Sequence, residues 1–553
     1  MRKASLLIAG VLALSTLACQ DLDVTNPNNP DRNVVVSSAE DVETLIATSF
    51  RQWFNRVQGL TPSLALSTAA DEFSSGFTDY GAHEQGVEPR NPIDNGPIAP
   101  NSPNRVPIST MYAVISGVNI GLQAISKYDL RLFQGNTDVT MRALAFGKFV
   151  QGLAHGWTAL LYDQAWVYSE SVDTDTIRFA PGFTQVQDLV RPYTEVRDTA
   201  LAQLSAALQI ARTNSFTLPG AFEGIWIPGI TMDNQGFARL IHTYIARTMV
   251  YWARTPEERA QVDWAAVISH IDQGITQDFA PMGTPGVMED WYKHRAARLR
   301  TVTPSDFMRV DYQAIGNADQ GNGFIQWYNK PWSERTPFAM TGVVDKRIIS
   351  SPTAPCTSSA PTGQANKGTY MGCHVATIFS AARGTGQRSY YFFHRLGTGE
   401  SYNRGPLLVV SVAEMDLLKA EGLIRLGRAA EALPLINKTR VENGGLPPVT
   451  LEGAPGPSCT PRKYDGSCGS LWDALRYEKR IEGLGVHAGV AHWDARGWQA
   501  MVVNTPLHYP MPGNELELMG IPEYTTGGGL KDSAPAPNPE RCPPGANLPR
   551  CPA

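Results

Sequence analysis

Apolar residues recur at helical spacing through much of the chain. The first such stretch lies in residues 42–57, where the apolar positions are Val42, Leu45, Ile46, Phe50, Trp53, Phe54 and Val57. Intervals of three and four place these side chains on one face of an amphipathic helix. Ser37, followed by Glu40 three residues later, predicts a capping box at the start of that helix.

The same periodicity predicts further helices in residues 110–127, 139–165, 193–212, 235–254, 262–275 and 470–484. Residues 411–442 predict two helices, and the small residues Ala420, Gly427 and Ala432 stand where these helices would approach and turn. This arrangement resembles a tetratricopeptide helix pair. We therefore predict a mainly α fold: a scaffold of tetratricopeptide-like helical pairs with long irregular, loop-rich insertions and a few short strands.

Residues 276–405 have a different pattern. They are rich in Gly, Pro, Asn and Ser, and they contain only short strand-like runs such as GQRSYYFFHRL at 386–396. We predict one domain over 37–553, with a helical scaffold in 37–275 and 406–500, a loop-rich ligand region in 276–405 and a Pro- and Gly-rich tail in 524–553. Long irregular segments on a regular scaffold favour a binding role or disorder.

The chain begins with MRKASLLIAGVLALSTLAC, in which Arg2 and Lys3 precede an apolar run and small residues. This pattern predicts a secretory signal peptide over 1–18. It resembles a bacterial lipoprotein signal, which implies that Cys19 carries a diacylglycerol and that residues 19–36 form a tether. An ordinary signal peptide with a chance cysteine is the alternative. No later segment has the length and apolarity expected of a membrane span, so the lipid is the predicted anchor.

With Cys19 assigned to lipid, six of the seven cysteines remain. An even number in an exported protein indicates disulfides, and the simplest pairing joins close neighbours in sequence. The predicted pairs are Cys356 with Cys373, Cys459 with Cys468, and Cys542 with Cys551. Zinc is the competing interpretation, but no CxxC occurs and His374 is the only histidine beside a cysteine. We predict no metal and no cofactor.

Composition narrows the function classes. Hydrophobic residues make up 42% of the chain and charged residues 18%, which is typical of a globular protein. The formal net charge is −5 and there is no basic run. The chain therefore has no electrostatic footprint for a phosphate backbone, and we expect no nucleic-acid partner.

Residues 414–449 and 471–498 resemble the SusD/RagB family of outer-membrane nutrient-binding lipoproteins. The matching positions are Arg440 and the run Gly445-Leu446-Pro447 in the first segment, then Glu478, Lys479, Arg480, Trp493, Asp494 and Arg496 in the second. The chain departs from the family at GVHAGVAH, just before Trp493, where an aromatic-Glu-Gly-x-Arg run is usual. The resemblance implies a lipid-anchored protein of the cell outer membrane that faces the exterior. It also implies an oligosaccharide or other nutrient ligand and a SusC-like TonB-dependent transporter as partner.

These motif residues have a structural interpretation. Trp493, Asp494 and Arg496 are expected at a helix end, with Asp494 capping and Arg496 paired to an acidic neighbour. Glu478 and Glu482 are four residues apart on a helix and would repel one another. The two alternatives for them are a solvated helix face and a buried ion network with Arg496.

Catalytic motifs are missing from the sequence: it contains no GxSxG, HExxH or GxxxxGK[ST]. Asp71 and Glu72 are adjacent carboxylates, but neighbouring side chains on a helix do not flank a glycosidic bond. We predict a protein that binds and is not an enzyme. The alternatives are a helical-repeat scaffold without a small ligand and a secreted glycoside hydrolase.

A carbohydrate site needs an aromatic platform with polar groups at its edge. Aromatic residues in irregular segments suit this need better than those on periodic faces, so we assign Trp53, Trp157, Trp252 and Trp264 to the core. The predicted ligand-binding residues are Trp291, Tyr292, Trp327, Tyr328, Asn329, Trp332, Phe77 and Tyr80.

Overall fold

The computed structural model describes residues 38–75, 81–88, 90–91, 93–98, 103–172, 177, 185–221, 224–296, 308–354, 356, 366–375, 389–395 and 404–524. Cys19, Phe77, Tyr80, Cys542 and Cys551 lie outside these residues. The described part of the chain is mainly helical, which confirms the predicted fold class.

The longer helices are α3 (Ala39–Val57), α5 (Arg105–Lys127), α6 (Thr140–Leu161), α7 (Tyr193–Thr213), α8 (Asn234–Tyr251), α14 (Val412–Arg425), α15 (Ala429–Glu442) and α16 (Leu471–Gly483). The shorter ones are α4 (Ser63–Ala69), α9 (Pro256–Ala260), α10 (Trp264–Asp272), α11 (Trp291–Ala296), α12 (Tyr312–Ile315), α13 (Gly323–Tyr328), α17 (Val490–Gly497) and α18 (Gly513–Leu518). Three 3-10 turns are η4 (Val186–Leu189), η5 (Gly316–Ala318) and η6 (Trp332–Glu334).

Strands are short and form small antiparallel sheets within the described residues. Five of these sheets are two-stranded: β1 (Phe73–Ser75) with β9 (Met308–Val310), β2 (Phe133–Gln134) with β3 (Thr137–Asp138), β4 (Gln164–Trp166) with β5 (Val190–Pro192), β6 (Thr217–Leu218) with β7 (Met232–Asp233), and β8 (Met282–Gly283) with β13 (Gly405–Pro406). The sixth, three-stranded sheet has the order β10 (Asn366–Lys367), β11 (Met371–Cys373), β12 (Tyr391–Phe393). The strand-like run at 386–396 thus supplies β12.

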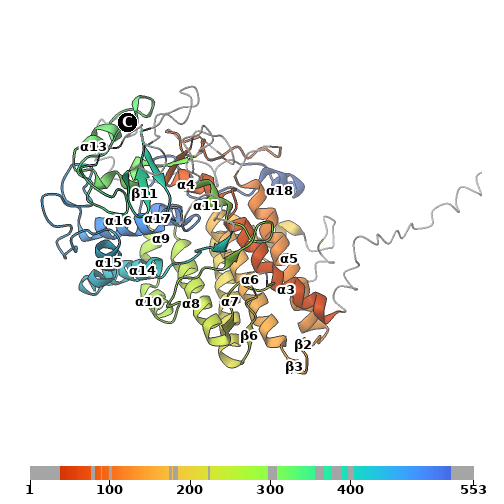
Figure 1. Cartoon of the computed structure of the whole chain (residues 1–553). Coiled ribbons are helices and arrows are strands. Elements are labelled where there is room, and N and C mark those ends of the chain that lie inside the picture. Colours follow the sequence, from red (N-terminus) through yellow and green to blue (C-terminus); the bar gives the residue numbers. More distant parts are fainter. Residues whose placement is uncertain are drawn as a thin grey trace, which may run out of the picture.

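Helices α3, α5, α6, α7 and α8 lie side by side and enclose the helical core (Figure 1). Two glycines of α6 let its neighbours approach closely. A Cβ at Gly147 would lie 2.7 Å from Leu122 of α5, and one at Gly152 would lie 2.6 Å from Leu204 of α7. Larger residues at these positions would push the helices apart.

The start of α3 corrects one prediction. The capping residue is Ser38 and not Ser37: Ser38 has an extended backbone, and its hydroxyl accepts a hydrogen bond from the Asp41 amide at 3.3 Å. Consecutive serines offer two registers for the same cap, and the sequence pattern does not distinguish them.

Helix α5 corrects a second prediction, because its length and composition would allow it to cross a membrane. Of its most apolar stretch, 61% is buried inside the protein. Its apolar face contributes Ile108, Met111, Ile115 and Leu122 to the helical core, so packing explains its hydrophobicity.

Helices α14 and α15 form the predicted tetratricopeptide-like pair. Ala420 and Ala432 are fully buried in one cluster between them, and Gly427, in the turn, has a φ of +75°. A residue with a side chain rarely adopts that conformation, which explains the glycine.

The loop-rich region begins and ends at neighbouring points of the helical scaffold. Gly283 pairs with Gly405 in the β8–β13 sheet, and Phe279 bridges to Val410. These contacts bring the two ends of the predicted 276–405 region together. Inside it, short elements share a second hydrophobic cluster with α16, the loop-rich core, which includes Val310, Ile315, Tyr391, Phe393 and Ile481.

Two disulfides crosslink irregular segments of the loop-rich half of the protein. Cys356 pairs with Cys373 and Cys459 pairs with Cys468, with Cα atoms 5.4 Å and 5.6 Å apart. Both pairings agree with the prediction from sequence spacing. The proposed Cys542–Cys551 pair lies outside the described residues and stays a prediction.

Candidate functional site

Three of the predicted ligand-binding aromatics lie inside the loop-rich core. Tyr292, Trp327 and Tyr328 are 0%, 3% and 3% exposed. The Tyr292 hydroxyl donates to Glu72 Oε2 at 3.3 Å, and the Trp327 ring lies 5.0 Å from the ring of Tyr312. A ring without an exposed face has no surface for a sugar, so the prediction is corrected for these three residues.

The sequence of α13 explains why Trp327 and Tyr328 are buried. Phe324, Trp327 and Tyr328 stand at intervals of three and four, so the short helix presents them together to the core. The Gly- and Asn-rich surroundings favour an irregular segment, but the spacing of these three residues is that of a helical face.

The remaining predicted residues divide into two groups. Trp291 is 36% exposed and its Nε1 donates to Glu289 Oε2 at 2.9 Å, Trp332 is half-buried and Asn329 is exposed. These three stay predictions. Phe77 and Tyr80 lie outside the described residues.

A separate pocket of about 310 Å³ opens beside α16. Four segments line it: residues 461–465, which belong to the disulfide loop (residues 459–468); the α16 residues Asp473, Arg476, Tyr477 and Arg480; Ala314 and Asn317; and Trp498 with Ala500. Its size lies at the lower end of the range for small-molecule sites. It suits a small ligand or the end of a longer one.

The disulfide loop is held in place by Arg462 as well as by its own disulfide. The Arg462 guanidinium donates to the carbonyl oxygens of Gln320 at 2.9 Å and Gly466 at 3.1 Å. Asn317 Nδ2 donates to the Arg462 carbonyl at 2.5 Å, and the Arg462 amide donates back to the Asn317 carbonyl at 2.8 Å. The disulfide and these hydrogen bonds therefore fix the conformation of this wall of the pocket.

The α16 wall begins at a capping box, in which the Ser470 hydroxyl accepts from the Asp473 amide at 3.2 Å. Asp473 Oδ2 accepts from the Ser470 amide and hydroxyl in return, at 2.9 and 2.7 Å. One and two turns further along, Arg476 and Arg480 present guanidinium groups to the pocket. Arg476 lies 3.9 Å from Asp473, and Arg480 donates to the Gln313 carbonyl at 2.9 Å.

Two partly exposed aromatic rings complete the pocket. Tyr464 packs on Tyr328 with ring centroids 4.7 Å apart. Trp498 donates from Nε1 to Glu421 Oε1 at 3.1 Å, and its ring lies 6.1 Å from that of Trp472. Rings whose positions are set by such contacts, with amide and charged groups around them, can bind a hydroxyl-bearing ligand with an apolar face.

No pattern in the sequence predicts that these residues form a pocket. The available signal was the predicted Cys459–Cys468 pair, which closes a short loop around PRKYDGS and presents Tyr464 among charged residues. Arg476 and Trp498 had no comparable signal, because they face the pocket only through the packing of α16 against the residues after α17.

No metal-binding arrangement is found in the described residues, where no three His, Cys, Asp or Glu side chains cluster suitably for an ion.

Comparisons with known proteins give a structural match without a sequence match. No protein-family model matches the chain, and no curated protein does. A SusD superfamily protein from Bacteroides vulgatus has a TM-score of 0.52 and 12% identity, with 89% of this chain and 99% of that one covered. A SusD superfamily protein from Bacteroides fragilis has a TM-score of 0.52 and 13% identity, with 88% and 100% covered.

A third structure, a SusD-like carbohydrate binding protein from Bacteroides fragilis, has a TM-score of 0.50 and 14% identity over 84% of this chain and 87% of that chain. The chain has the SusD fold. Its resemblance to that family, carried by a few short motifs in the sequence, thus extends over most of the backbone.

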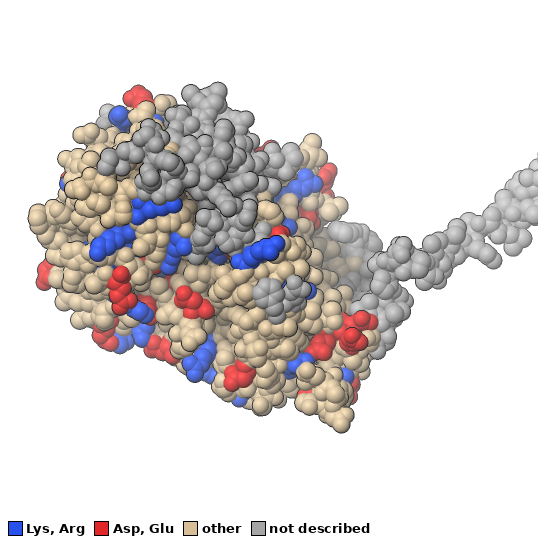
Figure 2. Space-filling model, viewed as in Figure 1, with Lys and Arg blue, Asp and Glu red and all other residues tan. Residues whose placement is uncertain are grey.

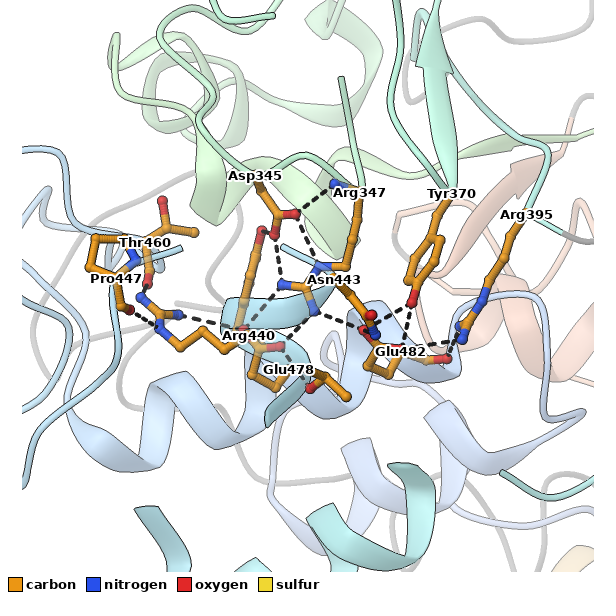
Figure 3. A network of polar contacts seen from close by, with 12 residues as sticks. Asp345, Arg347, Tyr370, Arg395, Arg440, Asn443, Pro447, Thr460, Glu478 and Glu482 are labelled. Carbon is orange, nitrogen blue, oxygen red and sulfur yellow. Dashed lines mark hydrogen bonds and ion pairs between the residues drawn. The ribbon is translucent and has the colours of Figure 1, made fainter. Parts of the chain in front are cut away.

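In this SusD fold the motif residues are structural, and Arg347 is at their centre. Arg347 is fully buried and its guanidinium lies 2.7 Å from Asp345, 2.6 Å from Glu478 and 3.0 Å from Glu482 (Figure 3). Burial by itself lowers the pKa of Arg347, but Asp345 and Glu478 outweigh it and raise the pKa well above the ordinary value. The two glutamates four residues apart are therefore joined by a shared cation.

The network reaches the pocket through two side chains. Arg440 donates to the carbonyl oxygens of Pro447 at 2.7 Å and Thr460 at 2.6 Å, so it holds the start of the disulfide loop (Figure 3). Tyr477, which lines the pocket, donates to Asp345 at 2.8 Å. The buried ions thereby fix two walls of the candidate site.

The Trp-Asp-Arg cluster of the SusD fold also differs in detail from the prediction. Val490–Gly497 is helix α17, and Asp494 lies within it, 2.9 Å from Arg259 and 2.7 Å from Lys479. Arg496 donates to the carbonyl oxygens of Leu160, Leu507 and Tyr251 and not to a carboxylate. The predicted cap and the alternative Glu478–Arg496 network are both wrong, because the decisive partners come from segments distant in sequence.

Proposed function

We propose that this protein is an outer-membrane lipoprotein that binds an oligosaccharide and delivers it to a SusC-like TonB-dependent transporter. The observation that carries the proposal is the match over most of the chain to SusD-fold structures, one of which is a carbohydrate binding protein. The pocket beside α16 adds a site with rings and polar groups suited to such a ligand.

Membrane attachment follows from Cys19 and the short polar tether after it. The two acyl chains of a diacylglycerol on Cys19 would supply stable anchoring. Cys19→Ser should move the protein from the membrane fraction to the soluble fraction of the cell envelope. Retention of the Cys19→Ser protein in the membrane would contradict lipid anchoring, and protease accessibility on intact cells tests whether the protein faces the exterior.

Ligand binding is tested on a glycan array with purified protein. Tyr464→Ala should weaken binding at the pocket, while Trp291→Ala and Trp332→Ala test the exposed aromatics that remain predicted contacts. Tyr128→Ala is the matched control, because Tyr128 is a 58% exposed aromatic at the end of α5 and does not line the pocket. Lack of binding to any glycan would favour a helical scaffold without a small ligand.

The transporter partner is tested by mild detergent extraction and affinity purification of the tagged protein. A barrel transporter should co-purify with the tagged protein. If no transporter is found in the purified fraction under gentle conditions, the delivery role is contradicted.

We also propose that the protein is not an enzyme. Asp465 and Asp473 are the carboxylates of the pocket, and both accept hydrogen bonds from their own turn or helix cap. Release of reducing ends from a bound glycan by the pure protein would contradict this and favour the glycoside hydrolase alternative.

A further inference from the structure

A second concave surface lies on the helical scaffold and shares no lining residue with the pocket beside α16. Its volume is about 270 Å³. Arg212 comes from the end of α7, Gln235, Arg239 and His242 come from one face of α8, and Asp272 comes from the end of α10. We call this surface the α7–α8 cleft.

A buried histidine positions Arg212 in the cleft without neutralising its charge. Arg212 Nη2 donates to His242 Nε2 at 2.8 Å and to Gln273 Oε1 at 2.6 Å. Because a guanidinium only donates, His242 has its proton on Nδ1 and donates from there to His270 Nδ1 at 2.8 Å. Burial, with smaller contributions from His270 and Arg212, lowers the pKa of His242 to about 4, so its ring is neutral at pH 7. Both acceptors of Arg212 are therefore uncharged.

The second cation of the cleft is Arg239, which is exposed on α8 one turn before His242. Its guanidinium has no hydrogen bond or ion pair with any residue that the structure describes. Asp272 is the acidic residue of the cleft, and its Oδ1 accepts from Lys419 Nζ at 2.5 Å. Since Lys419 balances Asp272, the charges of Arg212 and Arg239 remain without a carboxylate partner among the described residues.

Such an excess is local. Figure 2 shows Lys and Arg side chains interspersed with Asp and Glu side chains over the lower part of the molecule, where the helical scaffold lies in Figure 1. Interspersed charges of both signs cancel at a short distance, whereas a concave surface with two unbalanced cations concentrates anions.

The lining of the cleft indicates which anion it suits. Two guanidinium groups offer forked donors that match phosphate oxygens, and together they balance a doubly charged anion. Gln235, exposed four residues before Arg239 on the same face of α8, adds an amide donor. Ala238 is the single apolar side chain that the described residues bring to the cleft, so a sugar ring would find no aromatic face there.

The cleft lies at the end of the scaffold where α3 begins. Arg142 joins three segments at this end: it donates to Glu43 of α3, to Gln134 Oε1 of β2 at 3.1 Å and to the Thr217 carbonyl of β6 at 3.3 Å. Strand β6 directly follows α7, and Figure 1 shows β2, β3 and β6 at the same end of the helices. A lipid on Cys19 would attach the protein by this end, which makes the phosphate groups of membrane lipids one source of the anion.

We propose that the α7–α8 cleft binds a phosphate group, held between the guanidinium groups of Arg212 and Arg239 with the Gln235 amide as a further donor. The volume of the cleft exceeds that of a phosphate ion, so the group can belong to a larger ester. Two sources share this chemistry: a soluble phosphate or phosphate ester, and the headgroup of a membrane lipid. The inference goes beyond the proposed function and does not depend on glycan binding.

Two binding measurements distinguish these sources. Both use the mature chain with Cys19→Ser, produced without its signal peptide, so that no lipid anchor contributes. Phosphorus NMR titration measures the affinity for inorganic phosphate. Co-sedimentation compares vesicles of phosphatidylcholine with vesicles in which part of that lipid is replaced by phosphatidic acid. We expect binding of inorganic phosphate, a preference for the phosphatidic acid vesicles, or both, and either should weaken as NaCl is added, because salt screens exposed charges.

Variants locate the effect. Arg212→Gln and Arg239→Gln should each weaken binding about tenfold, since each removes charge-assisted hydrogen bonds to the anion. Arg239→Gln should also keep the original melting temperature, because Arg239 has no partner among the described residues, and it thereby separates binding from stability. Arg191→Gln is the matched control, because Arg191 is a 43% exposed arginine of β5 and does not line the cleft.

Phosphate binding that both variants weaken, without a vesicle preference, would assign the cleft to soluble phosphate. A vesicle preference that both variants lose would assign it to a lipid headgroup. Three results would overturn the inference: no binding in either measurement, undiminished binding in both variants, and acetate bound as tightly as phosphate. Glycan binding is measured at the other pocket, so none of these results changes the proposed function, and a failure of glycan binding would leave the phosphate site standing.

Discussion

The helical core and the loop-rich core are stabilised in different ways. In the helical core, long helices pair their own backbone groups, and the interior is filled by apolar side chains such as Phe146, Phe149 and Phe237. In the loop-rich half, short elements leave carbonyl oxygens to be paired by side chains. Buried arginines supply the donors: Arg335 donates to Lys330 and Tyr328, and Arg440 to Pro447 and Thr460.

The unpaired backbone groups give the loop-rich half a physical reason to bury arginines. A guanidinium carries five donors in a fixed fork, so one arginine can satisfy several carbonyls that no strand or helix reaches. Its buried charge must then be balanced, as Asp345, Glu478 and Glu482 balance Arg347. The helical core is filled mainly by apolar side chains, whereas the loop-rich core also depends on the Arg347 network.

The largest expected effect comes from removing the cation of that network. Arg347→Met leaves Asp345, Glu478 and Glu482 buried without their shared partner, and the free energy of unfolding should fall by about 3–5 kcal/mol. Urea unfolding followed by circular dichroism measures it. Arg428→Met is the control, because the exposed Arg428–Glu431 pair should contribute almost nothing. A similar small effect of both variants would mean that the network is not needed for stability.

We expect the helical core to lose stability when a buried side chain is shortened. Leu204→Ala in α7 leaves a cavity against Gly152 of α6, and we expect a loss of about 2–5 kcal/mol in the free energy of unfolding. Leu201→Ala, at a partly exposed position of the same helix, should cost clearly less. Equal losses for the two leucines would contradict this dependence on buried volume, because Ala has a higher helix propensity than Leu and propensity cannot cause a loss.

The two disulfides of the loop-rich half differ in their relation to the pocket. Removing each in turn therefore tests whether stability and ligand binding change independently. Replacing Cys459 and Cys468 together by Ser should lower the free energy of unfolding by about 2–3 kcal/mol and also weaken glycan binding, since residues 461–465 line the pocket. Replacing Cys356 and Cys373 together should cost a similar stability without the same loss of binding, because neither residue lines the pocket. Parallel denaturation and calorimetric titrations of both variants check this, and an equal loss of affinity in the two would contradict it.

The remaining effect depends on pH and concerns Glu72, whose pKa is raised by burial to about 8. Below about pH 4.5 its carboxyl is protonated in both folded and unfolded chains, and its pKa shift has no effect. Between about pH 4.5 and 8 only the unfolded chain releases this proton, so the free energy of unfolding falls as pH rises, by at most about 1.4 kcal/mol per unit.

Glu72→Gln keeps an acceptor for the Tyr292 hydroxyl and removes the titration. The variant should match the original protein near pH 4.5 and exceed it in thermal stability increasingly up to pH 8. Glu452→Gln, at an exposed carboxylate, is the control that should not show this trend. A constant difference across the pH range would contradict the assignment to Glu72.

Prediction from sequence succeeded where a local pattern determines the structure. The 3.6-residue period identified the long helices, and the small residues Ala420, Gly427 and Ala432 identified the α14–α15 pair. Close cysteine spacing identified the two disulfides of the described residues. In these cases the partner residues are near in sequence, so few alternatives compete.

It failed where the partner is distant. The irregular pattern around Tyr292, Trp327 and Tyr328 predicts ligand-binding rings, but Glu72, Tyr312 and Tyr464 cover these three side chains. The pocket is made by four segments between residues 314 and 500, and no local pattern encodes their meeting. Likewise, Glu478 and Glu482 looked mutually repulsive until Arg347, 131 and 135 residues away, was placed between them.

The sequence by itself therefore determined the helical scaffold, the short disulfide loops and the family that the chain resembles, since periodicity, cysteine spacing and short motifs are properties of neighbouring residues. Only the tertiary structure decided which aromatic rings are buried and which charges are paired. It also decided where a pocket opens, because burial and charge pairing depend on which distant segments pack together.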